Sequence, residues 1–134
     1  MVAALAALSG CAAPRPAEPS RRVVVASDHV TLAEQDALIE LGRGARVRVR
    51  LESQKMAVAR RRWRITVVDG AAVAPHGNPW FAAKHAHAAL EPGNGIFDFD
   101  AVAPGRATVT FDYRRDDEPV SAAERTARFD FVVR

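Results

Sequence analysis

The chain has 134 residues, of which 49% are hydrophobic and 26% charged, a composition typical of one globular domain. Its net charge of +3 is small for a nucleic-acid-binding protein, and 7% aromatic residues exclude a surface that stacks successive bases. A single cysteine excludes an internal disulfide. No nucleophile motif is recognisable, so we expect a binding module that is not an enzyme and needs no cofactor.

The N-terminus predicts export from a bacterial cytoplasm. Residues 2–8 are apolar without a break, which is too short to span a bilayer but suits the core of a secretory signal. Leu8-Ser9-Gly10-Cys11 resembles the bacterial lipobox, in which the cysteine is acylated and the chain is cut before it. We expect a signal peptide over residues 1–10 and a lipid on Cys11. The alternative is a buried cysteine in an N-terminal helix.

The segment after the cysteine has the composition of a tether. Residues 12–22 hold three of the eight prolines and show no apolar periodicity, so residues 11–22 are expected to form a stiff, solvated link to a membrane. Residue 12 is not the aspartate that retains some lipoproteins at the inner membrane, which favours the outer membrane, facing the periplasm. The remaining residues, 23–134, are expected to form one monomeric domain.

The hydrophobic pattern from residue 23 onward has a period of two, which predicts β-strands. Residues 46–51 show it most clearly, because arginines alternate with Val47, Val49 and Leu51. Other strands are expected over residues 23–25, 38–41, 62–68, 96–102, 106–113 and 127–133. Glycine or proline turns separate them, so we predict an all-β, immunoglobulin-like β-sandwich of about six to eight strands.

Two short segments interrupt this pattern. Thr31 and Glu34 have the spacing of a capping box, which predicts a helical turn near residues 31–37. Residues 82–90 have helical propensity but no amphipathic face. Residues 78–81 read as a Pro-aromatic loop, which either offers a contact surface or folds back over one end of the sandwich.

Arginines form two basic sets in the first half of the chain. One is the stripe of Arg46, Arg48 and Arg50, and the other is residues 60–62 with Arg64. If the strands over 45–51 and 62–68 pair, these charges share one face of a sheet. That face is either simply solvated or attracts an acidic partner or anionic lipid headgroups.

Two further clusters are candidate cation sites. His76, His85 and His87 have no cysteine or suitably spaced carboxylate to complete a metal site, so we predict none. Residues 116–118 are acidic and precede a proline, which predicts the solvated tip of a hairpin rather than a cation site.

Several segments resemble the chagasin-type inhibitors of papain-like cysteine peptidases, which have an immunoglobulin-like sandwich. Residues 39–51 are similar to the family's opening hairpin, and Trp63 stands where the family has a tryptophan. Residues 97–109 and 113–133 are similar to its last strands. The resemblance implies an inhibitor of a papain-like cysteine peptidase, with Trp63 buried in the core.

The resemblance also implies three binding loops, over residues 53–61, 91–95 and 114–119, gathered at one end of the sandwich. The candidate contact residues in these loops are Gln54, Gly93, Asn94, Gly95 and Arg115. Asp116 and Asp117 stand where the family has a proline and an aromatic residue. The alternative is therefore a non-inhibitory envelope lipoprotein that binds another protein or an anionic surface.

Overall fold

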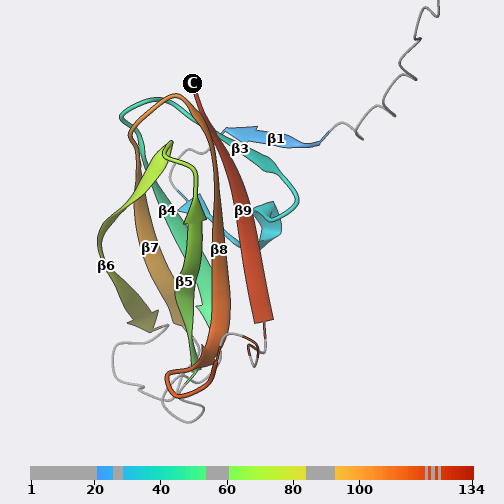
Figure 1. The fold of residues 1–134 in the computed structure, drawn as a ribbon, viewed down its shortest axis with the longest axis vertical. Coiled ribbons are helices and arrows are strands. Elements are labelled where there is room, and N and C mark those ends of the chain that lie inside the picture. The colour runs from blue at the N-terminus through green and yellow to red at the C-terminus, as the bar shows by residue number, and fades with distance from the viewer. Residues whose placement is uncertain are drawn as a thin grey trace, which may run out of the picture.

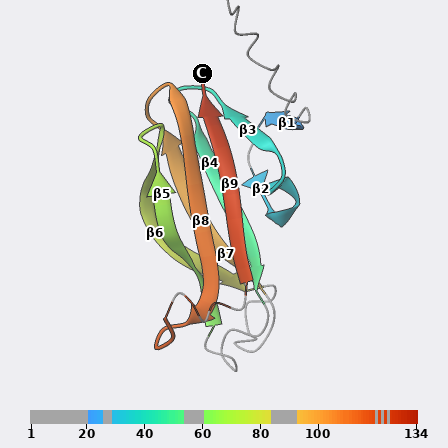
Figure 2. The same cartoon turned by 45° about the vertical axis from the view of Figure 1, so that its right-hand side comes forward.

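The computed structural model describes residues 21–25, 29–53, 61–83, 93–119, 121, 123 and 125–134. These residues form nine strands in two sheets that pack face to face (Figure 1; Figure 2), which confirms the predicted all-β sandwich. The five-stranded sheet has the order β1 (Val23–Val25), β3 (Leu38–Leu41), β9 (Arg125–Val133), β8 (Gly105–Arg115) and β5 (Arg61–Asp69). The four-stranded sheet has the order β2 (His29–Val30), β4 (Arg46–Ser53), β7 (Gly93–Ala101) and β6 (Val73–Ala83).

The core is built from the alternating residues that the sequence pattern marks as apolar. Phe111 of β8 lies at its centre, where its ring centroid is 4.8 Å from that of Phe97, 5.7 Å from Phe129 and 6.2 Å from Phe99. All three contacts have the edge-to-face geometry that aromatic pairs favour. Because β8 and β7 belong to different sheets, these rings hold the two layers together.

Trp63 of β5 forms a second link between the layers. Its side chain is only 4% exposed, and its indole N–H donates a hydrogen bond of 2.9 Å to the carbonyl oxygen of Glu52 in β4. The indole also lies 5.3 Å from the ring of Tyr113 and 5.4 Å from the guanidinium of Arg125. A buried indole needs a partner for its N–H, and here the partner belongs to the opposite sheet.

The predicted helical turn is present as a 3-10 helix over Leu32–Glu34. The backbone N–H of Thr31 donates to the Glu34 carboxylate at 2.7 Å, and the Thr31 hydroxyl accepts from the backbone N–H of Ala33 at 3.3 Å. This is the capping box that the spacing predicts. No helix in the part of the chain that the structure describes is long and apolar enough to cross a membrane.

Strand β6 is the largest departure from the sequence prediction, which treats residues 78–81 as a loop. Pro75 and Pro79 lack a backbone N–H, and Gly77 has a φ of 67°, so the segment reads as irregular. It nevertheless pairs with β7, with a shift of register between His76 and Trp80. The prolines are tolerated because β6 is an edge strand, and the bulge protects that edge from unwanted pairing.

Candidate functional site

Strands of both sheets end together at one end of the sandwich. In the four-stranded sheet, Ser53 at the end of β4 and Ala83 at the end of β6 both pair with Gly93 at the start of β7. In the five-stranded sheet, Arg61 at the start of β5 pairs with Arg115 at the end of β8. The bond from Trp63 to Glu52 joins the two sheets close to these ends. We call this end, at the bottom of Figure 1, the loop end.

The three loops expected from the sequence are all bounded by residues of the loop end. Ser53 and Arg61 flank the first, and Arg115 precedes the turn of the third, whereas residues 93–95 of the expected second loop begin strand β7. Gln54, a candidate contact residue, lies outside the described residues. The strand ends that the structure describes show that both sheets contribute to the surface at the loop end.

Arg115 is held at the start of the turn that follows β8. Its backbone N–H donates to the Glu118 carboxylate at 3.2 Å, and its guanidinium donates to Asp117 at 3.0 Å. The side chain is 41% exposed. It therefore presents a guanidinium at the loop end in an orientation that its own turn fixes.

The acidic turn over residues 116–118 is solvated at Asp116 and Asp117, as predicted, and it is also paired with arginines. Asp116 receives two hydrogen bonds from Arg62, at 2.9 and 2.8 Å, and also contacts Arg64. These pairs fasten the turn to β5 in the bidentate geometry that arginine and carboxylate favour. Burial lowers the pKa of the Arg64 guanidinium, and the positive charges of Arg62 and Arg114 lower it further.

The structure places Gly93, Asn94 and Gly95 inside strand β7 and not in a loop. Gly95 faces the interior, where an added Cβ would lie 3.2 Å from Cε2 of Phe97 and 3.5 Å from Cβ of Trp63. Its missing side chain therefore leaves room for the tryptophan. No local sequence pattern indicates this role, because closely spaced glycines are also typical of a loop.

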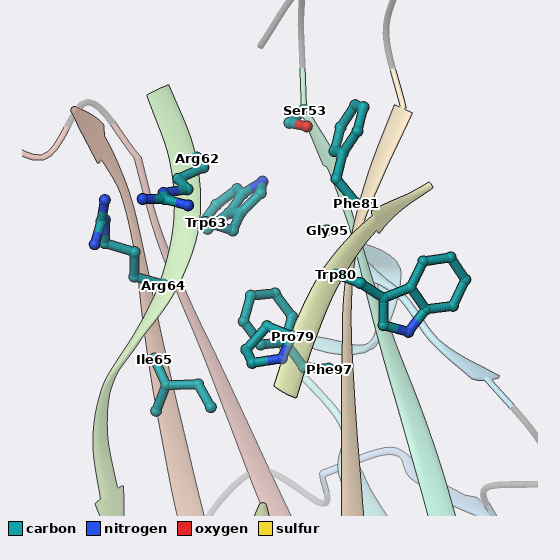
Figure 3. A pocket seen from close by; sticks show the side chains of 10 residues that line it. All are labelled: Ser53, Arg62, Trp63, Arg64, Ile65, Pro79, Trp80, Phe81, Gly95 and Phe97. Atoms are coloured by element: carbon teal, nitrogen blue, oxygen red, sulfur yellow. The ribbon is translucent and has the colours of Figure 1, made fainter. Parts of the chain in front are cut away.

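A groove opens beside the loop end, between the edge strands β5 and β6 (Figure 3). It has a volume of about 460 Å³. Trp63 and Ile65 point toward it from β5, whereas the Trp80 side chain of β6 points away (Figure 3). Its lining residues are Ser53, Arg62, Trp63, Arg64, Ile65, Pro79, Trp80, Phe81, Gly95 and Phe97. Sequence reasoning missed this groove because it did not predict β6.

The two basic sets do not share a face, so that hypothesis was wrong. Strands β4 and β5 lie in different sheets and do not pair. On β4, Arg46 lies 2.9 Å from Asp100, and Arg48 binds Asp98 at 2.8 and 3.1 Å. The hydrogen bond from Arg48 holds the pKa of Asp98 below its usual value, and that from Arg46 does the same for the pKa of Asp100. The stripe is therefore largely neutralised on its own sheet.

His76 and the exposed tryptophan, Trp80, have ordinary partners. Nδ1 of His76 lies 2.8 Å from a carboxylate oxygen of Asp100, while His85 and His87 lie outside the described residues. The described residues contain no group of three potential metal ligands. Trp80 is 50% exposed, and the Arg48 guanidinium stacks over its ring at 5.5 Å.

Two face-to-face sheets with a shared loop end define an immunoglobulin-like sandwich domain. The model of the chagasin family of peptidase inhibitors, I42, matches residues 40–133. The chain therefore belongs to the chagasin family, as its resemblance to these inhibitors indicates. This is a family of peptidase inhibitors and not of enzymes.

Solved structures with the same fold include a cysteine protease inhibitor. Amebosin is 15% identical, with a TM-score of 0.65 over 80% of this chain and 97% of its own. The cysteine protease inhibitor EhICP2 from Entamoeba histolytica is 14% identical, with a TM-score of 0.63 over 87% of this chain and 100% of its own. PbICP-C, solved in complex with falcipain-2, is 15% identical, with a TM-score of 0.52 over 84% and 99%. No curated protein matches the sequence closely enough to add to this assignment.

Proposed function

We propose that the protein inhibits a papain-like cysteine peptidase by inserting its loop end into the active-site cleft. The observation that carries this proposal is the meeting of Ser53, Arg61, Gly93 and Arg115 at one end of the sandwich. A cleft can be filled only by connections that project side by side, and these strand ends start or finish three such connections. Family membership and the complex of PbICP-C with falcipain-2 support the same assignment.

Arg115 is the residue to which we assign the main polar contact. Its guanidinium offers a planar fork of donors, which suits carboxylates and carbonyl oxygens at the rim of a cleft. In the free protein Asp117 accepts a hydrogen bond from the guanidinium and Glu118 accepts one from the Arg115 backbone N–H, so little side-chain entropy is lost on binding. Gln54, Gly93, Asn94 and Gly95 remain the other candidates, with Gly95 acting through the packing of Trp63.

Replacing Arg115 with alanine should weaken inhibition of papain about tenfold, equivalent to roughly 1.4 kcal/mol of binding free energy. The wild-type inhibition should also fall as salt is raised, because the contact is between exposed charges, and the variant should lose much of this dependence. The measurement is residual peptidase activity across a titration with the purified protein at low and high salt.

Arg128→Ala is the matched control, because Arg128 is an exposed arginine of β9 paired with Asp130 at 3.5 Å. It should inhibit as the wild type does. If the wild type leaves papain fully active at its highest soluble concentration, the proposed function is wrong while the fold assignment stands.

We further propose that the protein is a lipoprotein of the bacterial envelope, anchored to the outer membrane through Cys11 and facing the periplasm. The support is the lipobox-like sequence at residues 8–11 and the proline-rich segment that follows it. An inhibitor held there would act on peptidases that reach the periplasm.

Labelling cells with radioactive palmitate should mark the wild-type protein and leave Cys11→Ser unlabelled, because the thiol is the acceptor of the lipid. When the cells are fractionated, the wild-type protein should be found in the membrane fraction and the variant in the soluble fraction. Equal labelling of the two proteins would contradict the lipid anchor.

A further inference from the structure

The groove between β5 and β6 lies on a side of the sandwich that the sheets leave open. Strand β5 pairs only with β8, and β6 only with β7, so the facing edges of both strands have no strand partner among the described residues. Pro75 of β6 is in register with Phe99 of β7, so both residues lie on the same face of the sheet. Phe99 is fully buried whereas Pro75 is exposed, which shows that this face is open at β6. The inner face of β6 is therefore uncovered next to the groove.

The chemistry of the groove suits an apolar side chain with a polar backbone. Trp63 and Phe97 contribute buried aromatic surface, and Ile65, Pro79 and Phe81 complete the apolar lining. Its volume of about 460 Å³ is within the range of ligand-binding sites. Unpaired edge strands offer backbone donors and acceptors of the kind that bind an extended segment.

The hydroxyl of Ser53 is a buried polar group at the groove. Ser53 is only 2% exposed, and its hydroxyl makes no hydrogen bond with any residue that the structure describes. A buried hydroxyl without a hydrogen-bond partner destabilises the folded protein by about 1–3 kcal/mol. A bound group that forms a hydrogen bond with it removes this penalty, which favours binding. Ser53 lines the groove and also ends β4, so this atom lies where the groove meets the loop end.

The groove is near enough to the loop end to belong to the same interface. Pro79 is four residues from the end of β6 at Ala83, which is about 13 Å along a strand. A protein interface typically covers about 800 Å² on each partner, a patch roughly 30 Å across. A protein seated on the loop end would therefore extend over the mouth of the groove.

We propose that this groove is a second contact site for the peptidase bound at the loop end. It receives a bulky apolar side chain from an extended surface segment that borders the peptidase's cleft, and the backbone of that segment lies along the free edge of β5. The inference rests on the proposed function. It makes the groove a determinant of specificity among peptidases with similar clefts.

The test uses papain and a photoreactive benzoylphenylalanine introduced into the full chain at one of three positions. Pro79 reports on the groove, Asp117 on the loop end, and Pro75 is the matched control, an exposed proline of the same strand outside the groove. We expect crosslinks to papain from Pro79 and Asp117 and none from Pro75. Pro79→Arg should also weaken inhibition about tenfold, while Pro75→Arg should not change it.

The outcomes separate the two proposals. Crosslinking from Asp117 alone, with unchanged inhibition by Pro79→Arg, would overturn the groove contact and leave the loop-end function standing. Crosslinking from neither position would overturn both. Crosslinking from Pro79 alone would contradict inhibition through the loop end, and the groove could then not be a second contact for a peptidase bound there. Thermal unfolding of each variant shows that lost inhibition is not lost folding.

Discussion

Replacing Trp63 with alanine is expected to lower the free energy of unfolding by about 3–5 kcal/mol. The indole is 4% exposed and contacts Tyr113, so its removal leaves a large cavity between the sheets. The change also removes the hydrogen bond to the carbonyl of Glu52, which ties β5 to β4. Both losses act at the point where the two layers are joined beside the loop end.

Chemical denaturation of the two variants Trp63→Ala and Trp80→Ala would measure this effect. Trp80 is the matched control, since it is half exposed and contacts mainly the Arg48 guanidinium, and its loss should cost about 1 kcal/mol or less. Trp63→Phe should be intermediate, because it keeps one aromatic ring but loses the N–H donor and part of the apolar surface. Equal stability of Trp63→Ala and the wild type would contradict the described core.

Gly70→Ala is expected to cost about 2–4 kcal/mol for a different reason. Gly70, in the turn between β5 and β6, has a φ of 96°, which only glycine adopts readily. An added Cβ would also lie 2.5 Å from the carbonyl oxygen of Arg106, so the start of β8 would have to move. Backbone strain and a steric clash therefore add at one position.

Gly44→Ala separates these two contributions. Gly44 has a φ of 82°, but its added Cβ would meet no atom within 4 Å. It should cost only the strain of the left-handed conformation, about 1–2 kcal/mol. Thermal unfolding of both variants would give the difference, and equal losses would show that the turn at Gly70 moves away from β8 without cost.

The strands of the interior could be predicted because their residues alternate. Residues 46–51 and 96–101 each place apolar side chains on one face, and burial of that face is what stabilises a central strand. The two strands that the sequence did not predict, β2 and β6, lie at sheet edges. One has only two residues, and the other keeps its pairing despite two prolines because an edge strand needs fewer backbone donors.

The candidate site was less predictable, because it depends on which strands pair. The hypothesis that the two arginine sets share a face assumed that neighbours in sequence pair, whereas the chain crosses from one sheet to the other between β4 and β5. The partners of Arg62 and Arg48 lie about fifty residues away in sequence, at Asp116 and Asp98. No local pattern indicates such contacts, and they decide which charges remain available to a ligand.

Strand β1 determines the point at which the chain enters the folded domain. Val23 is in register with Leu38 and through it with Asp130, and Arg21 binds Asp130 at 2.7 Å. The chain thus enters at the far edge of the five-stranded sheet, four strand spacings or about 19 Å from β5. Whatever precedes Arg21 therefore joins the domain at the sheet edge opposite β5. The β5 edge, and the groove beside it, lie on the side of the sheet away from that point of entry.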